Sequence, residues 1–211
     1  MKIKICGITT LDDGLAAVEA GADMLGFNFY PPSPRYVEAA ACAAMIAGLR
    51  ARGARATMVG VFVNLPPAEV AAILDECGLD LAQLSGDEPP DDLALLGERA
   101  FKALRPRDAA AAASQAALYP RRAAPPTLLV DASAGVGRFG GTGQTGDWAA
   151  ARALAVGHPI LLAGGLRLEN VAAAVAAVQP WGVDVASGVE SSPGRKDPAK
   201  MREFVRRAHG K

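Results

Sequence analysis

Short apolar runs alternate with helix-like stretches along the whole 211-residue chain, and this alternation limits the fold more than any other feature. The runs that indicate strands are Lys2–Gly7, Met24–Phe29, Thr57–Val63, Asp80–Leu84, Ala100–Leu104, Thr127–Asp131, Pro159–Ala163 and Gly182–Ala186. The stretches with helical spacing are Leu11–Ala20, Val37–Arg50, Pro67–Cys77, Asp91–Arg99, Asp108–Leu118, Asp147–Val156, Leu168–Val178 and Pro198–His209.

Strict alternation of this kind predicts parallel strands, each followed by a helix that covers the sheet. With about 26 residues per strand–helix unit, the chain is long enough for a small closed barrel. We therefore predict an α/β protein that folds as a single compact (β/α)8 TIM barrel over residues 1–211. An open doubly wound sheet is the alternative that the same alternation allows.

Several predicted helices begin with residues that suit a helix start. Thr9 or Thr10 can cap the first helix, and Pro67 and Pro198 suit a first helical turn. The other candidate N-caps are Asp91, Asp108 and Asp147.

Composition narrows the choice of partners and compartment. Lys plus Arg and Asp plus Glu both number 22, so the formal net charge is zero and nothing indicates a nucleic-acid partner. Cys6, Cys42 and Cys77 are odd in number and widely spaced, which favours free thiols in a reducing compartment. We find neither a secretory signal nor an apolar stretch of membrane-spanning length. We expect a cytoplasmic protein with no membrane contact, monomeric, with a homodimer as the alternative.

Cys6 stands at the carboxyl end of the first predicted strand, which is the edge where α/β barrels carry their active sites. The two histidines are poorly placed, because His158 precedes a strand and His209 lies in the C-terminal tail. Cys6 is therefore the first candidate for proton transfer. A small buried hydrophobe is the alternative role for this residue.

Two charged residues follow other predicted strands. Asp131 ends the sixth strand, where a partly shielded carboxyl group can act as a general acid. Arg35 follows the second strand in a loop stiffened by three prolines, and a guanidinium held there suits two-pronged capture of a carboxylate. No histidine or carboxylate cluster has metal-ligand spacing, so we expect no catalytic metal.

Glycine-rich turns differ in what they indicate. Residues Gly141 to Gly146 match the G-x-G-x-x-G pattern, but they do not lie in a first strand–helix turn, so dinucleotide binding is not favoured. Gly164 and Gly165 follow the seventh strand, while Ser187 and Gly188 follow the eighth. These are the two loops that commonly bind phosphate in such barrels, and we predict a phosphate site there.

These residues lie in motifs through which the chain resembles phosphoribosylanthranilate isomerase, a family of tryptophan biosynthesis. The motifs are Lys4–Thr9, Gly26–Tyr36, Val59–Asn64, Gly140–Gly143, Ala163–Asn170, and Val183–Glu190 with Pro193-Gly194. The resemblance implies a cofactor-free Amadori rearrangement of N-(5′-phosphoribosyl)anthranilate, a phosphosugar, to 1-(2-carboxyphenylamino)-1-deoxyribulose 5-phosphate. Another phosphosugar barrel enzyme, such as an epimerase, synthase or different sugar isomerase, and a non-catalytic phosphosugar-binding or scaffold protein are the alternatives.

The resemblance also assigns roles to individual positions. It implies Cys6 as general base, Asp131 as general acid and Arg35 as the ligand of the anthranilate carboxylate. It further implies substrate contacts for Gln83, Gly141 and Gly143. One position departs from the family pattern, because Ser85 stands where the family usually has histidine.

A charged pair is predicted beneath the site. Strand alternation puts Lys4 on the same face as Cys6, one layer deeper in the barrel. A closed barrel makes the first and eighth strands neighbours, and Asp184 lies in the middle of the eighth. Because an unpaired buried charge is costly, we predict that Lys4 and Asp184 form an ion pair that supports the floor of the site.

Overall fold

The computed structural model describes residues 1–132 and 148–210. Within them, eight parallel strands close into a barrel in chain order, with β1 hydrogen-bonded to β8. The barrel strands are Lys2–Cys6 (β1), Met24–Asn28 (β2), Thr57–Phe62 (β3), Leu81–Leu84 (β4), Ala100–Leu104 (β5), Leu128–Asp131 (β6), Ile160–Ala163 (β7) and Gly182–Val185 (β8). The predicted TIM barrel is confirmed, and the doubly wound alternative is wrong.

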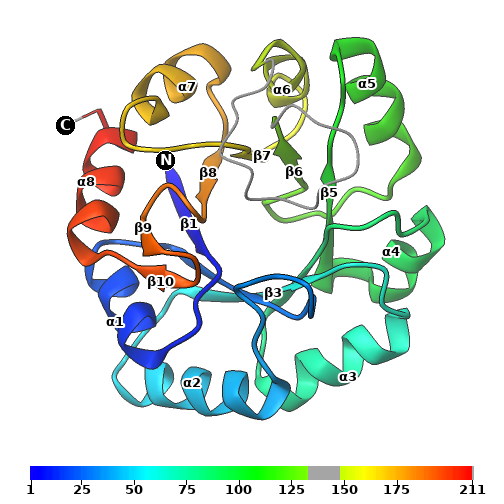
Figure 1. Cartoon of the computed structure of the whole chain (residues 1–211). Helices are drawn as coiled ribbons and strands as arrows, with labels where there is room; N and C mark the ends of the chain where they lie inside the picture. Colours follow the sequence, from blue (N-terminus) through cyan, green and yellow to red (C-terminus); the bar gives the residue numbers. More distant parts are fainter. Residues whose placement is uncertain (133–147, 211) are drawn as a thin grey trace.

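The helices form a ring around the strands (Figure 1). They are Leu11–Glu19 (α1), Ala39–Ala51 (α2), Pro67–Cys77 (α3), Pro90–Leu96 (α4), Ala109–Leu118 (α5), Trp148–Ala155 (α6), Val171–Val178 (α7) and Pro198–Ala208 (α8). A short 3-10 turn, Gly97–Arg99 (η1), follows α4. Alternate residues of each strand face either this ring or the barrel interior. In β1, for example, Ile3 and Ile5 belong to the core between strands and helices.

The side chains that fill the barrel form a second, smaller apolar cluster. Its buried members are Met24, Val59, Leu81, Phe101, Ala103, Leu129, Leu161 and Ala163. They come from six different strands and close the interior, so the barrel is a packed core and not a pore. One pocket lies at the carboxyl ends of the strands, and a second lies at their amino ends, near Lys2, Thr57 and Trp181.

Helix starts follow the predicted capping residues, with one exception. Thr10 Oγ1 accepts a hydrogen bond from the Asp13 backbone N–H at 3.1 Å, and Asp108 Oδ1 accepts one from the Ala111 N–H at 2.7 Å. Asp91 as N-cap is wrong, because α4 already begins at Pro90 and Asp91 lies in its first turn. Asp147, the remaining candidate, lies outside the described residues.

The sequence did not predict a small hairpin between the last strand and the last helix. Residues Glu190–Ser192 (β9) and Arg195–Lys196 (β10) pair antiparallel across the Pro193-Gly194 turn. In Figure 1 this hairpin lies beside β1, between that strand and the helices α8 and α1. It therefore adds side chains to the same edge that carries the predicted site.

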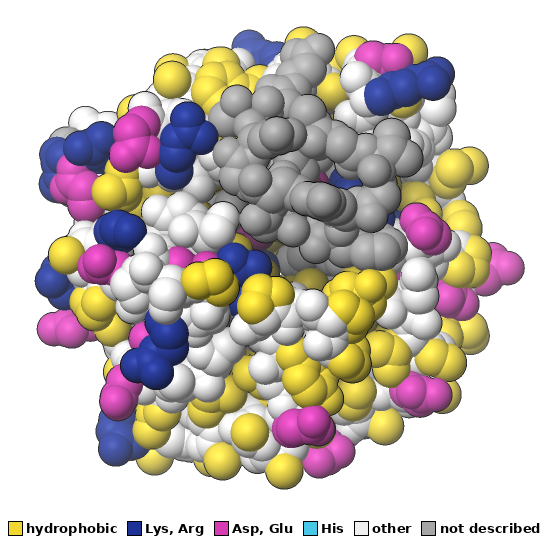
Figure 2. All heavy atoms as spheres, in the orientation of Figure 1, with side chains coloured by type: hydrophobic (Ala, Val, Ile, Leu, Met, Phe, Trp, Pro, Cys, Tyr) yellow, Lys and Arg dark blue, Asp and Glu magenta, His cyan; other side chains and the backbone are white. Residues whose placement is uncertain are grey.

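The surface gives little direction about partners. Figure 2 shows acidic and basic side chains interspersed around the edge of the face seen in Figure 1, in keeping with the balanced composition. Among the helices in the described part of the chain, none combines the length and the apolar character that crossing a membrane would take.

Candidate active site

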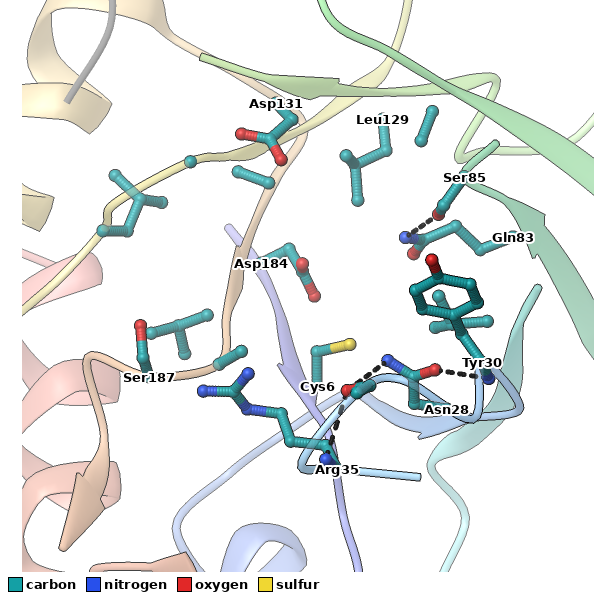
Figure 3. A pocket seen from close by; sticks show the side chains of 18 of the residues that line it. Cys6, Asn28, Tyr30, Arg35, Gln83, Ser85, Leu129, Asp131, Asp184 and Ser187 are labelled. Atoms are coloured by element: carbon teal, nitrogen blue, oxygen red, sulfur yellow. Dashed lines mark hydrogen bonds between the residues drawn. The ribbon is translucent and has the colours of Figure 1, made fainter. Parts of the chain in front are cut away.

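A pocket opens at the carboxyl ends of the strands and brings together predicted residues from distant parts of the chain (Figure 3). Its lining includes Cys6, Arg35, Gln83, Asp131, Gly164, Gly165, Asp184 and Ser187. Gly188, also predicted here, stands next to Ser187 but is not part of the lining. Gly141 and Gly143 lie outside the described residues.

Cys6 ends β1 and projects toward the centre of the pocket in Figure 3. Its thiol is free and nearly buried. Gly26 on the adjacent strand makes room for it, because a β-carbon there would lie 2.8 Å from the Cys6 sulfur. Burial raises the pKa of the Cys6 thiol, and the neighbouring Lys4 ammonium opposes that rise. The site therefore holds a shielded thiol directly above a positive charge.

The predicted ion pair beneath the thiol is present. Lys4 Nζ lies 2.8 Å from Asp184 Oδ1, and the lysine side chain has no exposed surface. The two residues are register partners across the β1–β8 seam that closes the barrel. Burial lowers the pKa of Lys4, but the Asp184 carboxylate and the Cys6 sulfur outweigh it, so the pKa lies above its ordinary value.

Arg35 is held by a residue for which the sequence predicted no role. Its Nε and Nη2 donate to the two carboxylate oxygens of Glu190, each at 2.7 Å. Lys196 Nζ donates to the same carboxylate at 2.8 Å, and both Glu190 and Lys196 are buried. Burial opposes the charge on Glu190, but hydrogen bonds from Arg35 and Lys196 lower the pKa of its carboxyl below the ordinary value.

The signal for this arrangement was visible in the sequence. Pro193-Gly194 is a turn dipeptide, and the short segments on either side carry Glu190 and Lys196. A hairpin there would place the two charges on one small ribbon. Their connection to Arg35, more than 150 positions earlier, carried no signal of its own.

The loop after β2 is stiffened by hydrogen bonds as well as by prolines. Asn28 Oδ1 accepts from the Tyr30 backbone N–H at 2.8 Å, and Asn28 Nδ2 donates to Ser33 Oγ at 3.2 Å. Ser33 Oγ also accepts from the Arg35 N–H at 3.1 Å. These bonds, drawn in Figure 3, fix the backbone that presents the Arg35 side chain.

Gln83 projects into the pocket from the end of β4 (Figure 3). Its Nε2 donates to Ser85 Oγ at 3.0 Å, whereas its buried Oε1 accepts no hydrogen bond from the part of the chain that the structure describes. A buried acceptor without a partner is costly, so this oxygen is suited to a ligand donor. Ser85 thus orients the Gln83 amide.

Behind β4, a buried lysine fixes the following loop. Lys102 Nζ donates to Glu88 Oε2 and to the Gly86 carbonyl, each at 2.7 Å. Glu88 Oε1 in turn accepts from the backbone N–H groups of Asn64 and Gly86. The segment that follows Ser85 is therefore held from several sides.

Asp131 ends β6, lines the pocket and is half-buried. In Figure 3 its carboxyl group lies beyond Asp184, on a different wall from Arg35. The two candidates for proton transfer thus approach the pocket from β1 and from β6. A bound molecule can lie between them.

The loops after β7 and β8 lie side by side, joined by an isolated bridge between Arg167 and Gly188. Gly164 and Gly165 have φ of 94° and 63°, a left-handed turn that side chains resist. Gly188 packs so closely on the Leu166 carbonyl that a β-carbon would collide with it. Backbone N–H groups of this double loop can converge on an anion.

Neither histidine lies in the lining of this pocket. His158 precedes β7 at the opposite end of the barrel, and His209 follows α8. Within the described residues, no three histidine, cysteine or acidic side chains gather as a metal site requires.

Comparisons with known proteins agree with this geometry. The family model described as N-(5′phosphoribosyl)anthranilate (PRA) isomerase matches residues 3–207. N-(5′-phosphoribosyl)anthranilate isomerase of Geobacter sulfurreducens is 48% identical over 211 residues, which cover 100% of this chain and 99% of the relative.

Two solved structures are also similar over their full lengths. The crystal structure of phosphoribosyl anthranilate isomerase from Thermotoga maritima superimposes with a TM-score of 0.87 at 32% identity, covering 100% of both chains. A crystal structure of such an isomerase in complex with reduced 1-(o-carboxyphenylamino)-1-deoxyribulose 5-phosphate superimposes with a TM-score of 0.84 at 32% identity, again covering 100% of both chains.

Proposed function

The chain belongs to the N-(5′-phosphoribosyl)anthranilate isomerase family, an enzyme family of tryptophan biosynthesis, and from this membership we propose how its own residues carry out the reaction. Cys6 is the general base and Asp131 the general acid of an Amadori rearrangement that converts N-(5′-phosphoribosyl)anthranilate to 1-(2-carboxyphenylamino)-1-deoxyribulose 5-phosphate. The observation that carries this proposal is that Cys6 and Asp131 line one pocket from different walls.

The chemistry requires one proton to be given and one to be taken. The Asp131 carboxyl group donates a proton to the furanose ring oxygen, and the bond from that oxygen to C1′ breaks to leave a protonated imine. The Cys6 thiolate then removes the proton from C2′, and the electron pair of that bond forms the enolamine. The enolamine gains a proton at C1′ and loses the hydroxyl proton at C2′, which gives the ketone.

A cysteine can serve as base here because the substrate helps. The protonated imine withdraws electrons from C2′ and makes its proton more acidic, so a strong base is not needed. The thiolate is the active form, and its fraction depends on the charges around the sulfur. This is how the site manages without a histidine among its lining residues.

Kinetics of single variants test the acid–base pair. We expect Cys6→Ser and Asp131→Asn to lower kcat by about 10²- to 10⁴-fold with little change in KM, since each removes a proton transfer used in the transition state. Cys42→Ala is the matched control, because Cys42 is a buried thiol in α2 away from the pocket. Near-normal kcat in either site variant would remove that residue from its role.

Arg35 binds the anthranilate carboxylate in this proposal. Glu190 occupies the Nε–Nη2 side of the guanidinium, which leaves the Nη1–Nη2 edge for a second two-pronged contact. The substrate carboxylate is present in ground and transition states alike, so Arg35→Ala should mainly raise KM, by about 10- to 100-fold.

Arg35→Lys should restore little of this binding, because an ammonium lacks the two-pronged edge. Arg50→Ala, which breaks a pair with Asp80 on the outer surface, is the control arginine variant. If carboxylate and descarboxy inhibitors are discriminated equally by wild type and Arg35→Ala, the assignment is wrong.

The substrate phosphate lies between the loops after β7 and β8, on backbone N–H groups of Gly164, Gly165, Ser187 and Gly188. Gly164→Ala should weaken inhibition by inorganic phosphate, because a side chain strains the turn at φ 94°. Gly53→Ala is the matched control, since Gly53 has φ 80° but no neighbouring atom within 4 Å of the added carbon. Equal loss in both variants would argue against this location.

Three expectations about the whole molecule stay predictions. They are its organisation as a single domain over residues 1–211, its monomeric state and its cytoplasmic location. Substrate contacts by Gly141 and Gly143 are likewise part of the proposal, on residues outside those described.

A further inference from the structure

We infer that the Lys4 ammonium stabilises the thiolate form of Cys6, and that Asp184 holds the ammonium in place for this purpose. Lys4 is then a positioning residue for the base and more than a support for the barrel floor. The inference rests on the proposed role of Cys6 as base. Its test is a titration of the thiol itself, which does not depend on turnover.

The geometry comes from strand alternation in β1. Lys4 and Cys6 are two positions apart, so both side chains face the barrel interior. A β-carbon on Gly26 would lie 2.8 Å from the Cys6 sulfur and 3.0 Å from Lys4 Nζ. Sulfur and nitrogen are therefore no more than about 6 Å apart, within the range where an opposite charge shifts a titration.

The surroundings make this charge effective. Lys4 has no exposed surface and Cys6 is 9% exposed, so little water screens the pair. Asp184 Oδ1, 2.8 Å from Lys4 Nζ, fixes the ammonium below the sulfur. Burial lowers the pKa of Lys4, but the Asp184 carboxylate, helped by the Cys6 sulfur, raises it above the ordinary value and keeps the lysine charged. A permanent positive charge thus lies under the base.

Other charged groups also face the sulfur. Asp184 of β8 opposes the thiolate, although more weakly than Lys4 favours it. Lys196 of β10 and Arg35 of the loop after β2 are positive, but both are engaged by the Glu190 carboxylate. Asp131 lines the pocket from β6. Among the described groups, Lys4 lowers the pKa of the Cys6 thiol most, against the rise caused by burial.

The thiol is titrated by its rate of alkylation with iodoacetamide across pH, followed by mass spectrometry on the peptide that contains residue 6. We expect Lys4→Met to raise the pH midpoint by about 1–3 units, because the thiolate loses its nearest opposite charge. Lys4→Arg keeps the positive charge and should leave the pH midpoint close to the wild-type value. Lys102→Met is the matched control, a buried lysine of β5 paired with Glu88, and should leave the midpoint unchanged.

A second variant guards against misfolding of the first. Lys4→Met with Asp184→Asn leaves no unpaired buried charge, and it should still raise the midpoint, though less than Lys4→Met alone. Wild-type midpoints in Lys4→Met and in Lys4→Met/Asp184→Asn would overturn the inference, as would an equal shift in Lys102→Met. Failure of Cys6 as base would appear differently, as near-normal kcat in Cys6→Ser with the alkylation shifts still present.

Discussion

Lys4 on β1 and Lys102 on β5 are both buried barrel lysines paired with a carboxylate, yet their surroundings differ. Lys102 is 2% exposed. Its Nζ donates to Glu88 and to the carbonyls of Leu84 and Gly86. Lys4 Nζ donates to Asp184 and has the Cys6 sulfur nearby. One lysine fixes a loop through backbone groups, whereas the other places a charge beside the Cys6 thiol.

The pKa values of the two lysines also shift in opposite directions. At Lys102, burial outweighs the attraction of Glu88 and lowers the pKa of the ammonium. At Lys4, the Asp184 carboxylate and the Cys6 sulfur outweigh burial and raise the pKa. Sequence context alone would describe both residues as lysines in the middle of an apolar strand. We expect the second neighbour of each buried ion pair, a carbonyl or a thiol, to decide whether the pair serves the structure or the chemistry.

The largest expected effect is on stability and separates the two sites by double variants. Removing one partner at either site should cost about 3–5 kcal/mol, because a buried charge is left unpaired. Lys4→Met with Asp184→Leu should recover much of that loss. Lys102→Met with Glu88→Leu should recover little, since the N–H groups of Asn64 and Gly86 lose their acceptor. Urea unfolding of the four single and two double variants measures the difference.

Equal recovery at the two sites would contradict this prediction. It would mean that the backbone groups around Lys102 find other partners, and that the loop after β4 does not depend on the pair. Lys102 would then not be the residue that fixes this loop.

The next effect is on turnover. At neutral pH, Lys4→Met should lower kcat about 10- to 10³-fold, in proportion to the thiolate lost when the pKa of Cys6 rises. The deficit should shrink as pH increases, because the thiolate returns. Lys102→Met should change kcat far less and without that pH dependence. Profiles of kcat against pH for the two variants measure this difference. Parallel profiles would contradict a special effect of Lys4 on the Cys6 thiolate.

The smallest effect is on stability in alkaline solution. It is measured in a Cys6→Ala background so that the thiol does not contribute, and we expect the Asp184 carboxylate to keep the pKa of Lys4 raised without the sulfur. Because the folded pKa of Lys4 is raised, its contribution is fully present below the unfolded value of about 10.4 and is lost above the raised value. Because the folded pKa of Lys102 is lowered, the unfolded chain binds more protons between the two values, and stability rises with pH there.

The Cys6→Ala protein is the reference. The difference in unfolding free energy between it and the same protein with Lys4→Met/Asp184→Leu should stay constant from neutral pH to about 10. Relative to Lys102→Met/Glu88→Leu, the reference should gain stability with pH, at most about 1.4 kcal/mol per unit. Urea unfolding at several pH values tests the signs. A rising difference at the Lys4 site would contradict them.

Much of the fold and part of the site could be predicted because their causes are local or periodic. Alternating runs set the order of strands and helices. The observed boundaries differ from the predicted ones by no more than three residues. Cys6, Asp131 and the Gly164–Gly165 turn could be predicted to share one pocket because a parallel barrel brings every strand's carboxyl end to one edge. Even the Lys4–Asp184 pair, 180 positions apart, follows from alternation plus closure of the barrel.

By itself, the sequence determined which residues sit at the ends of strands and which way they face, since period and closure are global rules that few residues can override. Only the tertiary structure decided how the loops meet. Glu190 binds Arg35, and Gly26 makes room for the Cys6 sulfur beside Lys4. Such contacts depend on distances between segments without a common period, and hydrogen bonds and packing fix those distances only once the barrel has closed.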